Sequence, residues 1–192
     1  MNYAVIKKND ISNGPGVRVS LFVSGCRHRC KGCFNSEAWD FSYGRPYTEH
    51  TEKEIINALK PGHIAGLSFL GGEPFEPENT EALTALALRF HEAYPHKTLW
   101  CYSGFTYEEI LGGARCAASG GAGQEDAKRL LSLIDVLVDG KFVEAQKDAG
   151  LLFRGSSNQR ILDVRKSLDK GAPVWAEGVW ERKMGSGDID EI

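Results

Sequence analysis

The chain has 192 residues, of which 42% are hydrophobic and 26% are charged, and its formal net charge is -3. This length suits one domain with a real core, and the composition excludes a disordered or fibrous chain. The small negative charge argues against a broad nucleic-acid interface, which needs a surplus of basic residues. Because the sequence has neither a signal-peptide pattern nor an apolar run of about 18 residues, we expect a cytoplasmic protein without membrane contact.

Strand patterns alternate with helix patterns along most of the chain. Residues Val17–Val23 alternate and then turn wholly apolar, which is typical of a strand buried in a parallel sheet. After Thr48 a capping-box pattern, with Thr51 as the expected N-cap and Glu54 three residues on, predicts a helix that ends before Pro61. Further helices are expected at about 79–94, 107–111 and 125–133, and further strands at 65–70, 98–102, 134–138, 151–154 and 161–164.

This alternation predicts an α/β fold made of βαβ units around a mostly parallel sheet. Since one unit takes roughly 30 residues, the chain is too short for eight of them, and we expect a partial, open (β/α) barrel. Residues 1–168 are expected to form this domain and residues 169–192 a C-terminal extension, with one more strand or a docked tail at 174–180. A run at about 112–124 is rich in Gly, Ala and Ser, and its composition predicts a surface insertion.

Three of the five cysteines lie within eight residues, as Cys26, Cys30 and Cys33 with C-x3-C-x2-C spacing. They are too close together to link distant parts of a fold, and clustered thiols in a reducing compartment indicate metal binding or catalysis. Thiolates select zinc, Cu(I) or iron–sulfur clusters. A [4Fe–4S] cluster normally takes four cysteines, so three ligands would leave one iron open for chemistry.

The main alternative for the cysteines is a structural zinc site, for which Cys101 or His28 would have to supply a fourth ligand. The context favours a cluster over zinc, because the cysteine loop follows a buried strand of an α/β sheet, whereas zinc knuckles usually organise small domains without such a core. The remaining cysteines, Cys101 and Cys116, are interpreted as a buried strand thiol and a free loop thiol.

A second motif, Gly71-Gly72-Glu73-Pro74, follows the strand expected at 65–70. Ligands of α/β folds bind at the carboxyl ends of parallel strands, where both motifs are expected. Glycines let a ligand approach the backbone closely, although a Gly-Gly-Glu-Pro segment alone would more readily be an ordinary turn.

Together these motifs resemble the radical S-adenosylmethionine (SAM) superfamily. The segment Asn13-Gly-Pro-Gly-Val-Arg18 is similar to that of its glycyl-radical-enzyme activases. The superfamily often has an aromatic residue before the third cysteine, whereas here Gly32 precedes Cys33 and Phe34 follows it. Glycine before the third cysteine is similar to the branch that activates anaerobic ribonucleoside-triphosphate reductase. Four further segments are similar to the same branch: Val23-Ser-Gly-Cys26, Lys31-Gly-Cys-Phe-Asn35, Val136-Leu-Val-Asp-Gly-Lys-Phe142 and Arg154-Gly-Ser-Ser-Asn-Gln159.

The resemblance implies a [4Fe–4S] cluster on the three cysteines, with SAM chelating the open iron. Reductive cleavage of SAM would then give a 5′-deoxyadenosyl radical, which generates a glycyl radical on the large subunit of the reductase. The electron would come from reduced flavodoxin, and no residue is assigned as catalytic in its own right. The expected SAM-binding residues are Gly32, Cys33, Phe34, Gly71, Gly72 and Glu73, and the expected cluster ligands are Cys26, Cys30 and Cys33.

Two other functions stay open from the sequence: activation of pyruvate formate-lyase or another glycyl radical enzyme, and a non-catalytic zinc-binding module. Residues at other strand ends either line the SAM pocket or partner surface, or belong to ordinary loops. They are Ser103, Gly104, Asp139, Lys141 and residues 154–158. The tryptophans Trp39, Trp175 and Trp180 are expected to serve packing.

Overall fold

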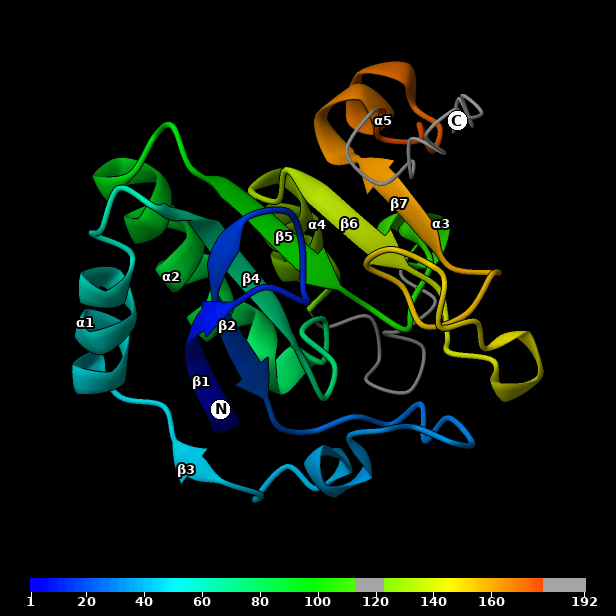
Figure 1. The fold of residues 1–192 in the computed structure, drawn as a ribbon, viewed down its shortest axis with the longest axis horizontal. Helices are drawn as coiled ribbons and strands as arrows, with labels where there is room; N and C mark the ends of the chain where they lie inside the picture. The colour runs from blue at the N-terminus through cyan, green and yellow to red at the C-terminus, as the bar shows by residue number, and fades with distance from the viewer. Residues whose placement is uncertain (113–122, 178–192) are drawn as a thin grey trace, which may run out of the picture.

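A mixed sheet of seven strands forms the centre of the computed structural model, which describes residues 1–112 and 123–177 (Figure 1). The strand order is β3-β1-β2-β4-β5-β6-β7, with β2, β4, β5 and β6 parallel and the strands at both edges antiparallel. The bounds are β1 Asn2–Asp10, β2 Val17–Val23, β3 Arg45–Pro46, β4 Ile64–Gly71, β5 Thr98–Tyr102, β6 Val136–Asp139 and β7 Arg160–Asp163.

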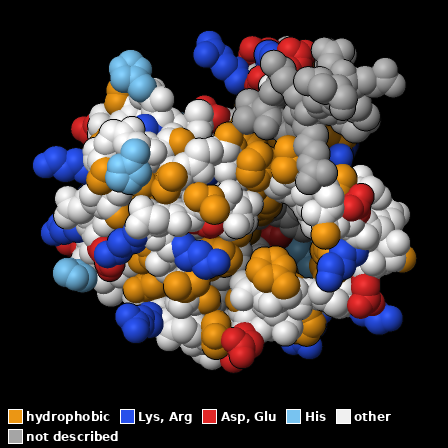
Figure 2. All heavy atoms as spheres, viewed as in Figure 1, with side chains coloured by type: hydrophobic (Ala, Val, Ile, Leu, Met, Phe, Trp, Pro, Cys, Tyr) orange, Lys and Arg blue, Asp and Glu red, His pale blue; other side chains and the backbone are white. Residues whose placement is uncertain are grey.

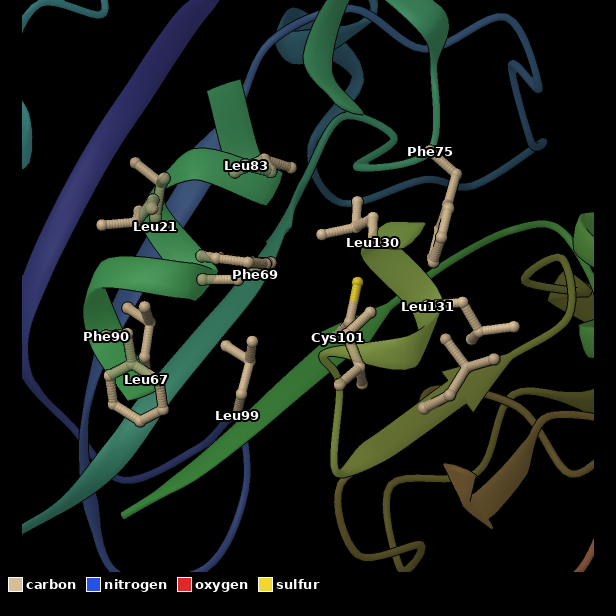
Figure 3. Close-up of a cluster of buried hydrophobic side chains, with 14 of the residues drawn as sticks. Leu21, Leu67, Phe69, Phe75, Leu83, Phe90, Leu99, Cys101, Leu130 and Leu131 are labelled. Carbon is tan, nitrogen blue, oxygen red and sulfur yellow. The ribbon is translucent and has the colours of Figure 1, made fainter. Parts of the chain in front are cut away.

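Helices cover one face of this sheet. Side chains from β2, β4 and β5 alternate, and those on one face pack with α1, α2 and α4 into one buried cluster (Figure 3). Cys101 lies in this cluster with an exposure of 0%, so its interpretation as a buried strand thiol is confirmed. The helices are α1 Glu49–Ala58, α2 Pro77–Ala93, α3 Tyr107–Gly112, α4 Gln124–Ser132 and α5 Val164–Lys170, with short 3-10 helices η1 Ser36–Trp39 and η3 Glu144–Gln146.

The opposite face of the sheet buries polar groups. Arg18 is fully buried there, and its guanidinium donates to the Ser68 hydroxyl and to the carbonyls of Leu67 and Thr98. Burial lowers the pKa of Arg18 to about 10. Trp100 lies on the same face and packs edge-on against Phe153. This face therefore buries polar side chains on β2 and β4 and an aromatic side chain on β5.

The α/β class and the largely parallel centre of the sheet are confirmed, and the sheet is open. Several local predictions were wrong. The N-cap of α1 is Thr48, which exchanges capping hydrogen bonds with Thr51, and no strand forms at 151–154. Strand β1 was not predicted, although it pairs with β2 along most of its length.

The C-terminal residues that the structure describes lie against β7. The amide of Asp163 donates to the carbonyl of Val174, and the amide of Ala176 donates to the carbonyl of Ile161. This contact agrees with the expected strand or docked tail as far as residue 177. Most of the expected insertion, together with Cys116 and Trp180, lies outside the described residues. None of the helices in the described ranges has the length and apolarity that a membrane crossing requires.

Candidate iron–sulfur and ligand site

The two sequence motifs lie side by side because their strands are parallel neighbours. Val23 at the end of β2 is opposite Gly71 at the end of β4. Beyond the strands the pairing continues, since the amide of Gly72 donates to the carbonyl of Val23 at 2.7 Å and the amide of Glu73 donates to that of Gly25 at 2.8 Å. The cysteine loop is thus fixed at its start against the Gly-Gly-Glu-Pro turn.

Both glycines of this turn are explained by the backbone of the chain itself. Gly71 has a φ of +113°, which favours glycine. A Cβ on Gly72 would lie 2.5 Å from the carbonyl oxygen of Gly25 and 2.9 Å from that of Ala38. The packing of the cysteine loop against β4 therefore requires glycine at position 72 even before any ligand is considered. Its expected contact with SAM stays a prediction.

A cavity of about 410 Å³ opens where the two motifs meet. Its size falls within the range of ordinary small-molecule sites, roughly 300–1,000 Å³. The viewed face of the molecule is hollowed, with hydrophobic side chains at the rim (Figure 2). Phe34 is 86% exposed and lines the cavity. All the sequence-predicted site residues line it: Cys26, Gly32, Phe34, Gly71, Gly72, Glu73, Cys30 and Cys33.

The three thiols share this cavity but differ in environment. Burial, followed by the charge of Glu73, raises the pKa of Cys26 to about 12. Burial, followed by the neighbouring Cys33, raises the pKa of Cys30. The amide of Cys33 donates to the carbonyl of Cys30 at 3.2 Å, so these two ligand candidates flank one turn. Metal binding at these thiols would have to release protons, as is general for cysteine ligands.

The donor set fits an iron–sulfur cluster by its chemistry, because three soft sulfur ligands face one cavity. Among residues 1–112 and 123–177, however, no three metal-ligating side chains are grouped closely enough to hold a metal ion in the present side-chain positions. The two fourth zinc ligands considered from the sequence lie in different places, since His28 lines the cavity of the triplet and Cys101 does not. Cys101 packs on the helix-covered face of the sheet, and the Nε2 atom of His28 contacts Glu73.

Comparison with known proteins identifies the family. Residues 12–162 match the family described as a 4Fe-4S single cluster domain. A protein of Vibrio cholerae is 43% identical over 163 residues, which are 84% of this chain and 97% of the relative. A protein of Escherichia coli K12 is 40% identical over 167 residues, which are 86% of this chain and all of the relative. Enterobacteria phage T4 has a relative that is 36% identical, covering 84% of this chain and 93% of its own length.

Each of these three relatives is named anaerobic ribonucleoside-triphosphate reductase-activating protein. This chain belongs to that family. Family membership agrees with the resemblance inferred from the motifs and with the iron–sulfur interpretation of the cysteine loop.

In this member of the activating-protein family, the carboxylate of Glu73 has an exposure of 1% and is fully engaged. One oxygen accepts from the Phe75 amide at 2.9 Å and the Ser103 hydroxyl at 2.9 Å. The other accepts from the Gly104 amide at 2.7 Å and lies 3.1 Å from Nε2 of His28. Any ammonium of SAM would have to share or displace one of these donors. The expected binding of Glu73 to SAM stays a prediction.

Other strand-end residues divide between the two roles considered from the sequence. Ser103, Gly104 and Arg154 line the cavity. Asp139 does not, because its buried carboxylate accepts from Arg160 and from the amide of Tyr107 at the start of α3. The structure adds cavity-lining residues that the sequence did not single out as site residues: Ser12, Tyr102, Phe142 and Phe153. Tyr102 could have been identified from the sequence, because it is aromatic and lies at the end of a predicted strand.

Proposed function

We propose that this chain activates an anaerobic ribonucleoside-triphosphate reductase through a [4Fe–4S] cluster bound by Cys26, Cys30 and Cys33. With one electron, the cluster would cleave bound SAM to methionine and a 5′-deoxyadenosyl radical, which takes a hydrogen atom from a glycine of the reductase. The observation that carries the proposal is the single cavity shared by the three thiols and the Gly71-Gly72 turn. The names of the relatives support the choice of partner.

Within this proposal, the chain's own residues bind and orient the ligand. The backbone at Gly71 and Gly72 would receive the methionine end of SAM, and Glu73 would assist with its ammonium. Gly32 and Phe34 flank Cys33, and Phe34 would cover the adenine or shield the cluster once a ligand is bound. Holding the reacting atoms in place and excluding water are the protein's contributions to such chemistry.

The proposed architecture is a partial barrel of the radical SAM type over residues 1–168, followed by a C-terminal extension over residues 169–192. The open sheet, with both motifs at the carboxyl ends of parallel strands, supports this. An open barrel leaves room for a segment of the large subunit of the reductase to complete the site. Reduced flavodoxin in the cytoplasm is the proposed electron donor.

Anaerobic reconstitution tests the chemistry. The protein loaded with iron and sulfide should turn brown, and with dithionite and SAM it should release methionine and 5′-deoxyadenosine in equal amounts. A colourless protein that retains only zinc would contradict the proposal and favour the non-catalytic zinc module. A brown protein that leaves SAM intact would contradict the assignment of SAM.

A further inference from the structure

The cysteine loop carries one inward-pointing side chain that is not a sulfur ligand. The side chain of His28 is 6% exposed, although its neighbours Arg27 and Arg29 are exposed. It lies midway between Cys26 and Cys30 in the sequence. A buried imidazole between two ligand positions of a surface loop fixes where that loop sits.

The imidazole lies where three loops meet. Its Nε2 atom lies 3.1 Å from Oε2 of Glu73, in the turn after β4. Its ring packs edge-on against Phe105, with 4.2 Å between ring centroids, in the segment after β5. The neighbouring Gly104 packs closely against the imidazole, because a Cβ at this position would lie 2.4 Å from the ring. The cysteine loop is thereby tied to the segments that follow β4 and β5.

The contact with Glu73 is specific because the carboxylate is saturated. A carboxylate offers about four acceptor sites. Three of those of Glu73 are used by Phe75, Ser103 and Gly104, and His28 uses the fourth. Without His28, a carboxylate that is 1% exposed would lack one donor. The loop would lose its side-chain contact with Glu73 and keep the backbone bond at Gly25 and the hydrogen bonds of Arg27 with Glu76.

We infer that His28 is a positioning residue for the cluster: through Glu73, it holds the turn between Cys26 and Cys30 so that their sulfurs converge on one centre. This inference rests on the proposed function, since it assumes that the cysteines bind the cluster. It also gives Glu73 a role within the chain that is separate from any contact with SAM. Groups that orient metal ligands typically change metal affinity by about 10- to 100-fold when they are removed.

The test compares His28→Leu, which removes the donor, with His28→Gln, whose amide nitrogen can reach the same carboxylate. His91→Leu is the matched control, because the imidazole of His91 also packs edge-on against a phenylalanine and its Nε2 contacts the carbonyl of Leu133, and neither residue lines the cavity. Each reconstituted protein is incubated with a ferrous chelator, and the rate of iron loss and the electron paramagnetic resonance spectrum of the reduced cluster are recorded.

For His28→Leu we expect iron loss at least about tenfold faster than in the wild type and a spectrum split into several species. His28→Gln should restore a single spectrum and slow iron loss, and His91→Leu should match the wild type in both. Unchanged iron loss and an unchanged spectrum in His28→Leu would overturn the inference. A wild-type protein that takes up no iron would instead contradict the proposed function.

If His28→Leu fails to fold, His28→Asn replaces it, because its amide is one methylene shorter than that of glutamine. The inference then requires faster iron loss in His28→Asn than in His28→Gln. Equal rates in these two folded variants would overturn it.

Discussion

The face of the sheet that carries α1, α2 and α4 is buried by aliphatic and aromatic side chains, whereas the face beside the cavity buries charge. Phe69 and Cys101 represent the first region, with exposures of 0%. Arg18 and Glu73 represent the second, and both are held by several hydrogen bonds. The helix-covered face stabilises the fold without directional contacts, while the cavity face fixes loop positions through hydrogen bonds that must all be made.

The largest expected contrast between the two faces concerns their cysteines. Alanine at Cys26, Cys30 or Cys33 should abolish stable cluster binding, because each removes one of three sulfur ligands. Alanine at Cys101 should leave it intact, because that thiol lies in the apolar cluster. Iron and sulfide counted per chain after anaerobic reconstitution measure this. Normal iron in any variant of the triplet, or its loss in Cys101→Ala, would contradict the assignment.

The apolar face should dominate stability. Phe69→Ala should lower the free energy of unfolding by about 3–5 kcal/mol, because it leaves a cavity in a packed core. The folded fraction of this variant should still take up iron normally at low temperature. Urea unfolding monitored by circular dichroism gives the first quantity, and iron per folded chain gives the second. A small loss of stability together with defective iron uptake would contradict the separate roles of the two faces.

Gly72 tests how tightly the cysteine loop is packed on β4. Gly72→Ala places a Cβ against the carbonyl oxygens of Gly25 and Ala38, so the loop must shift. We expect weaker SAM binding together with reduced iron uptake, and a stronger effect of both kinds in Gly72→Val. Calorimetric titration with SAM and iron analysis measure the two effects. Gly62→Ala is a suitable control, because a Cβ at Gly62 meets nothing within 4 Å. If Gly72→Val binds SAM and iron as the wild type does, the turn has no part in positioning the cysteine loop or SAM, and this prediction is wrong.

The smallest expected effect lies at the ion pair of Arg160 with Glu108, beyond the cavity. Hydrogen bonds from Arg160 lower the pKa of Glu108 from 4.5 to about 2. The pair therefore stabilises the folded state fully above pH 4.5, and this contribution is lost as the pH falls toward 2. Because Glu108 is half exposed, the effect on stability should be small. The difference in the free energy of unfolding between Glu108→Gln and the wild type should become smaller as the pH is lowered through this window. A difference that stays constant in urea unfolding would contradict the assignment.

The sequence predicted what depends on local pattern and missed what depends on distant contacts. Apolar runs located β2, β4 and β5, and the cysteine spacing indicated the three thiols that line the cavity. The strand predicted at 151–154 was wrong because its apolar residues line and border the cavity rather than pairing in the sheet. Strand β1 was missed because it ends in a run of polar residues, most of them exposed, and because its pairing with β2 is not visible in local pattern.

The same limit applies within the site. The contact between His28 and Glu73 joins residues 45 positions apart, and only the parallel pairing of β2 with β4 brings them together. The sequence offered His28 only as an alternative zinc ligand. In the same way, the need for glycine at position 72 arises from the carbonyl of Gly25, which the sequence leaves far away.

We propose that the cavity at the ends of β2 and β4 generates a radical on a glycine of the reductase. The most direct test mixes the reconstituted protein with SAM, a low-potential reductant and either the reductase large subunit or pyruvate formate-lyase, and records electron paramagnetic resonance spectra. We expect the glycyl-radical doublet on the reductase and none on pyruvate formate-lyase, with no signal when Cys30→Ala replaces the wild type. A doublet on pyruvate formate-lyase alone, or none on either protein while SAM is consumed, would contradict the proposal.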